Sequence, residues 1–189
     1  MSRKTTSILG LAIAGAILMT NSAHAGPKAY IGNFTDNTVS VIDTSTGSAI
    51  ATIPVAAGPH GMAISKDGAT VYLSGDGSSS LNVIDTASDK VTKTIEVGKK
   101  PNGITLTPDG KLLLVTVYGE DRIALLDTKS NEVVGTIPVP KPHTVSIEPN
   151  GKFAYAMLQS PMLDEFGLTD LTEDSDGARR YLVFLDMHA

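Results

Sequence analysis

The chain has 189 residues, of which 41% are hydrophobic and 19% charged, with a net charge of −5 and neither cysteine nor tryptophan. This is the composition of an ordinary globular domain, and it excludes disordered and collagen-like chains. The absence of cysteine excludes disulfide scaffolds, cysteine-ligated zinc and iron–sulfur clusters. No basic run resembles a surface that neutralises phosphates, so we expect no nucleic-acid partner.

Residues 1–25 have the pattern of an export signal. Arg3 and Lys4 precede an apolar stretch over residues 8–19, and a small-x-small cleavage site follows it. This stretch is too short to cross a bilayer as a helix, and no later segment is longer. We therefore predict a signal peptide and a mature domain over residues 26–189 that is periplasmic or secreted and has no membrane span.

Three short motifs recur along the mature domain with a period of 41 or 42 residues. They are an Asp-Gly or Asn-Gly turn, an apolar pair followed by Asp, and an Ile-x-Val segment. Their first residues are, in that order, Asp67, Asp109 and Asn150; Val41, Val83 and Leu125, with Phe184 as a fourth copy after a longer interval; and Ile53, Ile95 and Ile137. This recurrence divides the chain into four repeats, at about 27–68, 69–110, 111–151 and 152–189.

Each repeat contains short runs rich in Val, Ile, Tyr and Thr between turn residues, which favours β-strands. In the second repeat the expected strands are residues 61–65, 70–74, 80–85 and 91–97. Gly68 tolerates the positive φ of the tight hairpin between the first two. Four antiparallel strands in about 42 residues bury their faces only by stacking on neighbouring repeats. The sequence therefore predicts an all-β fold, a β-propeller of four-stranded antiparallel blades with little helix.

One segment of each repeat also resembles the motif of a known family. The segments Tyr30-Ile31-Gly32-Asn33, Tyr72-Leu73-Ser74, Leu114-Val115-Thr116-Val117 and Tyr155-Ala156-Met157 resemble the Tyr-Val-Thr-Asn motif of YVTN-type β-propeller repeats. The resemblance covers nearly all of residues 27–157 and implies a propeller. Related propellers are similar to surface-layer repeats, to the d1-haem domain of periplasmic nitrite reductases and to subunits near quinone cofactors. The resemblance therefore implies a fold rather than one function.

The four repeats do not fill a ring, since members of this family usually close about seven blades. We expect three strands in the first repeat, four in the second and third, and three in the fourth. The missing strands are the innermost of the first blade and the outermost of the fourth. We therefore expect about four blades in an incomplete ring, which is a fragment, a truncated reading frame or an obligate assembly. Its unpaired edges favour self-association.

The repeat register also predicts a candidate site. Pro-His, Pro-Asn and Pro-His pairs place His60, Asn102 and His143 just before three expected innermost strands. Innermost strands line the channel of a propeller, so these side chains are expected around one rim of it. Imidazoles in that position can bind a metal, a haem or an anionic ligand. In the alternative, each proline fixes the turn and the next side chain bonds the backbone, with no ligand.

The fourth repeat contains an insertion. In it 35 positions separate Gly151 from Asp186, against 17 between Gly68 and Asp85. The insertion, over residues 158–180, is rich in acids, and its Asp-Ser-Asp-Gly segment matches part of a calcium loop without the remaining ligand positions. The alternatives are a solvated loop, a calcium site and a contact for a partner or substrate. We predict that it is the most mobile part of the chain.

No residue set indicates catalysis. Asp43, Asp85 and Asp127 recur once per repeat before Thr, which is typical of turn capping. We expect an exported periplasmic scaffold that binds a protein partner or a small ligand through its channel rim and loops. The resemblance implies an alternative, a redox or cofactor-associated subunit similar to d1-haem or quinone-linked enzymes, with His60 or His143 near the cofactor. The identity of the ligand, any cofactor and the oligomeric state stay open.

Overall fold

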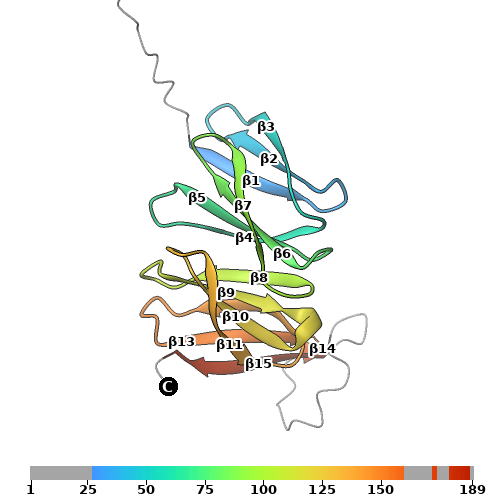
Figure 1. The fold of residues 1–189 in the computed structure, drawn as a ribbon, viewed down its shortest axis with the longest axis vertical. Helices are drawn as coiled ribbons and strands as arrows, with labels where there is room; N and C mark the ends of the chain where they lie inside the picture. The colour runs from blue at the N-terminus through green and yellow to red at the C-terminus, as the bar shows by residue number, and fades with distance from the viewer. Residues whose placement is uncertain (1–26, 160–171, 174–178, 188–189) are drawn as a thin grey trace, which may run out of the picture.

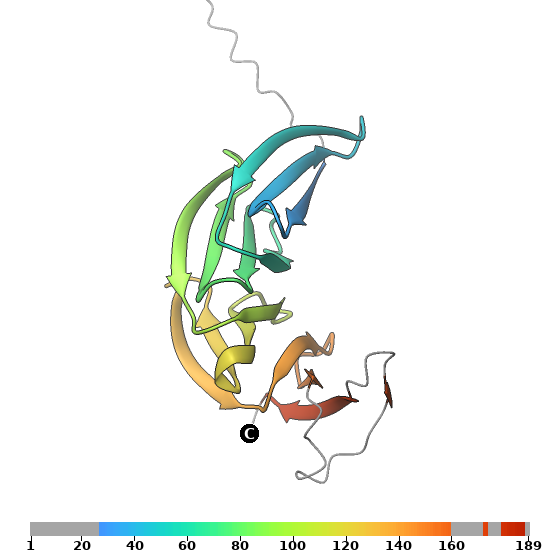
Figure 2. The same cartoon turned by 90° about the vertical axis from the view of Figure 1, so that its right-hand side faces the viewer.

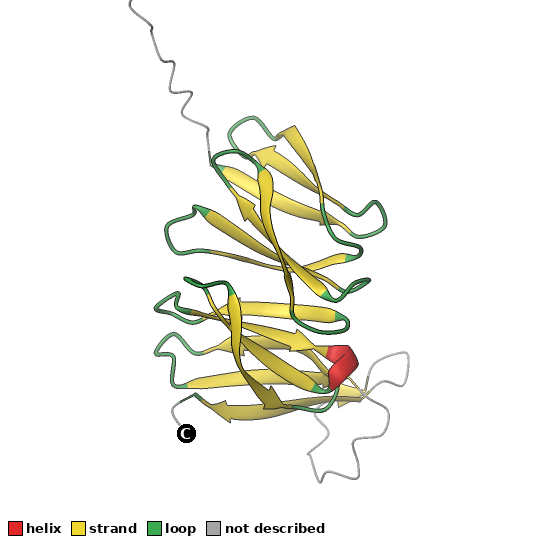
Figure 3. Ribbon diagram, in the orientation of Figure 1, coloured by secondary structure: helices red, strands yellow, loops and turns green. Residues whose placement is uncertain are grey.

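The strands of the fold follow the sequence repeat. The computed structural model describes residues 27–159, 172–173 and 179–187, and within them the chain forms fifteen strands and one short 3-10 helix. The strands lie in four separate antiparallel sheets, stacked one after another along the chain (Figure 1). Figure 2 shows that the sheets follow an arc that does not close into a ring. The predicted all-β propeller is confirmed, and in the described ranges the helix is limited to Tyr118–Glu120 (Figure 3).

Each sheet is one blade, numbered here in chain order. Blade 1 contains three strands, as predicted: β1 (Lys28–Asn33), β2 (Thr38–Asp43) and β3 (Ser48–Pro54). Blade 2 contains β4 (Pro59–Ile64), β5 (Thr70–Gly75), β6 (Ser80–Asp85) and β7 (Lys90–Glu96). Blade 3 contains β8 (Pro101–Leu106), β9 (Leu112–Val117), β10 (Arg122–Asp127) and β11 (Glu132–Pro138).

The outer edge of blade 4 differs from the prediction. Its strand order is β12 (Pro142–Ile147), β13 (Phe153–Gln159), β15 (Arg179–Asp186) and β14 (Thr172–Glu173). The predicted count of three strands is wrong, because β14 comes from the insertion and pairs with the start of β15. This short strand covers backbone groups that an edge would leave unpaired. The rest of the insertion, and the calcium and mobility predictions that concern it, lie outside the described residues, as does the predicted signal peptide.

Equivalent residues of the four repeats occupy equivalent places in the four blades. Each motif residue is the third of its strand and faces the first residue of the apolar pair, or the equivalent one, on the next strand. The pairs are Tyr30 with Val41, Tyr72 with Val83, Leu114 with Leu125 and Tyr155 with Phe184. The predicted equivalence is confirmed, so one blade can be compared with another residue by residue.

The hydrophobic core lies between the blades. Side chains of a strand point alternately to its two faces, and those of β5 show the consequence. Val71 and Leu73 pack in a cluster with Val39 and Val41 of blade 1, whereas Tyr72 packs in a second cluster with blade 3. A third cluster joins blades 3 and 4. Each inner blade is therefore held by both of its neighbours.

Aspartates in the hairpin turns stabilise these turns by accepting hydrogen bonds. Asp43 accepts hydrogen bonds from the backbone and hydroxyl of Ser45, and Asp127 accepts them from two backbone N–H groups of its turn. These bonds lower the pKa of both carboxyl groups. The Thr107 hydroxyl, with the Lys111 N–H, lowers the pKa of Asp109 to about 2. The predicted turn-capping role is confirmed.

These carboxylates predict acid-sensitive stability. A carboxyl group with a lower pKa in the folded state than its ordinary 3.8 stabilises the fold above that pH and loses this effect as the pH falls towards the folded value. We expect the free energy of unfolding, measured by urea titration at each pH, to be steady down to about pH 4 and to fall between about pH 4 and 2. Asp109→Asn should reduce that fall. A free energy that stays constant down to pH 2 would contradict the prediction.

Candidate functional site

The structure brings the three predicted rim residues together. His60 lies on β4, Asn102 on β8 and His143 on β12, at the same end of three neighbouring inner strands. They line a cavity of about 420 Å³ together with Phe34, Asp76, Lys100, Tyr118 and Gln159. The predicted meeting of the three side chains is confirmed, and their role in binding stays a prediction.

Four of the other five residues that line this cavity share a second register position that sequence reasoning missed. Phe34, Asp76, Tyr118 and Gln159 follow one another at the repeat spacing, each at the end of the strand that carries the family-like motif. Each of them has a different chemistry, so they form no motif. Only their common spacing could have placed them beside His60 and its equivalents.

Hydroxyl groups fix the inner strands that carry the site. The Ser74 hydroxyl accepts a hydrogen bond from the N–H of Gly61 at 2.8 Å and donates to the carbonyl of Asn102 in the next blade. In blade 3 the Thr116 hydroxyl lies 3.1 Å from the Gly103 carbonyl and 3.0 Å from the His143 carbonyl. In blades 2 and 3, a buried hydroxyl therefore positions the rim residue of the next blade.

Thr116→Val tests this positioning, because valine keeps the shape and removes the hydroxyl. We expect a loss of about 1–2 kcal/mol in the free energy of unfolding, since the His143 and Gly103 carbonyls lose a buried donor. The change should also move the imidazole NMR signals of His143. Thr92→Val is a matched control, because the Thr92 hydroxyl bonds a carbonyl of its own blade, at 3.2 Å. Equal shifts of His143 in both variants would contradict the role of Thr116.

The two imidazoles contact each other across the rim. The ring centroids of His60 and His143 lie 5.6 Å apart at an interplanar angle of 89°, and Phe34 contacts His60 edge-on at 6.5 Å. His60 is exposed, so its ring is open to a ligand in the channel. Within the described residues no three His, Asp or Glu side chains are grouped to hold a metal ion. The rim therefore offers two imidazoles and hydrogen-bonding groups rather than a metal cage.

Asn102 is the most unusual group of the rim. Its side chain is buried, with the residue only 6% exposed, and its Nδ2 lies 3.2 Å from Oδ1 of Asp76. A carboxylate only accepts hydrogen bonds, so this contact fixes which end of the amide faces Asp76. The Asn102 Oδ1 is buried and has no hydrogen-bond partner among the described residues. An unmatched buried acceptor costs about 1–3 kcal/mol, which a suitable donor would recover.

Comparisons with known proteins support the fold. A model of the YNCE-like β-propeller family matches residues 14–107. A chain of Kuenenia stuttgartiensis hydrazine synthase matches with a TM-score of 0.73 and 27% sequence identity, over 87% of this chain and 44% of that chain. Curated proteins gave no significant match.

These comparisons and the stacked four-stranded sheets define the class: the chain is a β-propeller repeat protein. It spans less than half the length of the hydrazine synthase chain that it matches. Significant structural matches extend to 1122 chains, and a fold this widespread does not specify a function. In the part of the chain that the structure describes, no helix is long and apolar enough to cross a membrane.

Proposed function

We propose that this propeller is an exported, periplasmic binding scaffold whose channel rim holds a small polar ligand at His60, Asn102 and His143. The observation that supports it most is the unmatched Oδ1 of Asn102 beside the rim cavity. Proteins rarely keep a buried polar atom without a partner unless it has a role. The pattern of residues 1–25 supports export.

The chemistry of the rim limits the ligand. It must carry an N–H or O–H group that can donate to Asn102 Oδ1, because amide oxygens only accept hydrogen bonds. His60 and His143 can donate or accept according to their protonation, which suits a second polar group on the ligand. Tyr118 and Phe34 add apolar ring surface on the same cavity. Since Asn102 Oδ1 is covered in this structure, binding requires a neighbouring side chain to move aside.

Binding can be tested on the purified full-length protein with a panel of polyols, amino acids and small amides, followed by NMR of the histidine and asparagine side chains. We expect at least one class to give saturable shifts that Asn102→Ala abolishes. Asn150→Ala is the control, because Asn150 caps a turn between β12 and β13 and lies outside this cavity. Binding that survives both Asn102→Ala and His143→Ala would rule out the rim.

A second candidate is a redox or cofactor-associated subunit. The contact between two imidazoles on the rim favours it, together with the match to a chain of hydrazine synthase, whose name is that of an enzyme. The visible absorption spectrum of the full-length protein separates the candidates. A haem band that changes in His60→Ala or His143→Ala would support this candidate, and a colourless protein would contradict its haem form.

A further inference from the structure

The boundary between blades 1 and 2 contains a lysine whose side chain is mostly covered. The Lys28 ammonium lies 2.7 Å from Oδ2 of Asp89 and 2.9 Å from the carbonyl oxygen of Thr86, both in blade 2. The Tyr30 hydroxyl donates to the other Asp89 oxygen at 2.6 Å. The side chains of Lys28 and Asp89 are only 12% and 15% exposed. This boundary is therefore built around one ammonium group.

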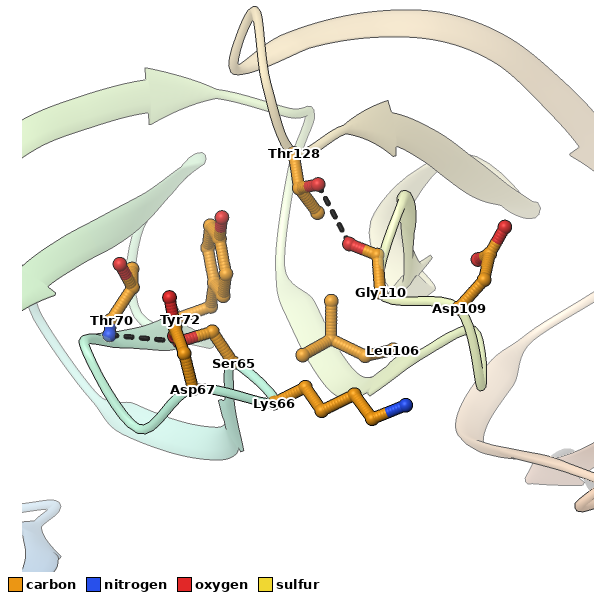
Figure 4. Close-up of a pocket in the computed structure, with 9 residues that line it drawn as sticks. All are labelled: Ser65, Lys66, Asp67, Thr70, Tyr72, Leu106, Asp109, Gly110 and Thr128. Atoms are coloured by element: carbon orange, nitrogen blue, oxygen red, sulfur yellow. Dashed lines mark hydrogen bonds between the residues drawn. The ribbon is translucent and has the colours of Figure 1, made fainter.

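The next boundary repeats this arrangement without the lysine. The equivalent positions lie 42 residues further along the chain. Thr70 is equivalent to Lys28, Tyr72 to Tyr30, Thr128 to Thr86 and Asn131 to Asp89. The threonine side chain ends three heavy atoms earlier than the lysine side chain does. A cavity of about 570 Å³ opens instead, and Thr70, Tyr72 and Thr128 all line it. Figure 4 shows these three side chains around it.

One acceptor at this boundary lacks a donor. Oδ1 of Asn131 is buried and has no hydrogen-bond partner among the described residues, whereas both oxygens of Asp89, its equivalent, are bonded. A cavity thus stands where the first boundary holds an ammonium; Thr128 lines it, whereas Asn131 lies behind this lining, so its covered Oδ1 is reached only when a neighbouring side chain moves aside. A buried acceptor without a partner is energetically unfavourable, and a hydrogen-bond donor would relieve this cost.

The charges around the cavity favour a cation. Two carboxylates, Asp67 and Asp109, line it together with one ammonium, that of Lys66, and Lys111 pairs with Asp109 at 3.2 Å on the exposed side. Outside this lining, the Lys93 ammonium lies 3.3 Å from the Ser130 carbonyl and 3.4 Å from that of Asn131. The buried Tyr72 also experiences this negative field: its pKa is raised, first by burial and then by the charges of Asp67 and Asp127. A field that disfavours a phenolate favours an ammonium in the same place.

We propose that the cavity between blades 2 and 3 is a binding site for a primary ammonium group on an alkyl chain. The nitrogen donates to Asn131 Oδ1 and to the Thr128 carbonyl, as Lys28 donates to Asp89 and Thr86. The alkyl chain lies along Tyr72 and Leu106, which line the same cavity. This site is at the opposite end of the inner strands from His60, so it does not depend on the rim.

The test is an NMR titration of the full-length protein with n-pentylamine hydrochloride, with n-pentanol as the uncharged control. We expect saturable shifts at the amides of Thr70, Thr128 and Asn131 with the amine only. Nα-acetyl-lysine methylamide is the second probe, and a response to it extends the site to lysine side chains of a partner. No saturable shift with either amine, or an equal response to pentanol, would overturn the proposal.

Variants of the two boundaries make the test specific. Thr70→Lys places an ammonium in the cavity from within, so it should raise the melting temperature and abolish the pentylamine shifts, while Thr70→Ser keeps them. Lys28→Thr should open an equivalent cavity between blades 1 and 2, so pentylamine should raise the melting temperature of this variant more than that of the wild type. If Lys28→Thr does not fold, the Thr70→Lys comparison decides alone. Pentylamine shifts that persist in Thr70→Lys would contradict the site.

Discussion

Replacing Gly103 with alanine is expected to lower the free energy of unfolding by about 2–3 kcal/mol, because the new methyl group has no space. A Cβ at this position would lie 2.6 Å from the Cα of Thr144 and 2.7 Å from the carbonyl oxygen of His143. Both are backbone atoms of β12, so the clash cannot be relieved by rotating a side chain. β8 must move away from β12, and the boundary between blades 3 and 4 must open.

Gly135→Ala is the matched control in the same blade. A Cβ at Gly135 would meet only the Leu125 side chain, at 3.4 Å from its Cδ1 and 4.0 Å from its Cβ, which is ordinary contact. We expect a change within about 0.5 kcal/mol for this variant. Urea unfolding of both proteins measures the difference. Equal losses, or a Gly103→Ala protein as stable as the wild type, would show that the inner strands are not in close contact in solution.

Repetition made the architecture predictable. Each strand pattern appears three or four times, so a deviation in one copy, such as Leu114 in place of Tyr72, does not hide the period. The same register placed His60, Asn102 and His143 at one rim, because equivalent residues of successive blades lie side by side. β14 could not be predicted, since a two-residue strand has no alternation and exists only through its pairing with β15.

The chemistry of the two cavities depends on contacts that a sequence does not contain. Asn102 is only one of several asparagines in the chain, and its unmatched oxygen follows from how Asp76 holds its amide. Likewise, Thr70 is an ordinary strand residue until its position is compared with that of Lys28 in the fold. The sequence repeat therefore predicts where a residue lies in the fold. What that residue can bind depends on the side chains around it, which the repeat does not predict.

A protein made of residues 26–189 alone is expected to self-associate, because, among the described residues, each terminal blade exposes an apolar side chain on the face away from its neighbour. Tyr30 packs towards blade 2, so Ile31, the next residue on β1, faces away from it and is 52% exposed. Ala156 and Leu158 pack towards blade 3, so Met157 between them faces the other way and is 37% exposed. A repeat array gains stability from each interface between neighbours, so both faces favour a partner blade.

Sedimentation velocity over a range of protein concentrations tests this prediction. Variants distinguish association through the terminal faces from non-specific association through other exposed apolar residues. Ile31→Glu combined with Met157→Glu should shift the protein towards monomer, because association would bury two carboxylates without partners. Val134→Glu is the control: Val134 is 59% exposed but lies on β11, the outer strand of blade 3, where no neighbouring blade would pack. A wild-type segment that sediments as a compact monomer and unfolds in one cooperative transition would mean that the four blades cap their own faces. Association that persists in the double variant and disappears in Val134→Glu would place the contact on the outer strands instead.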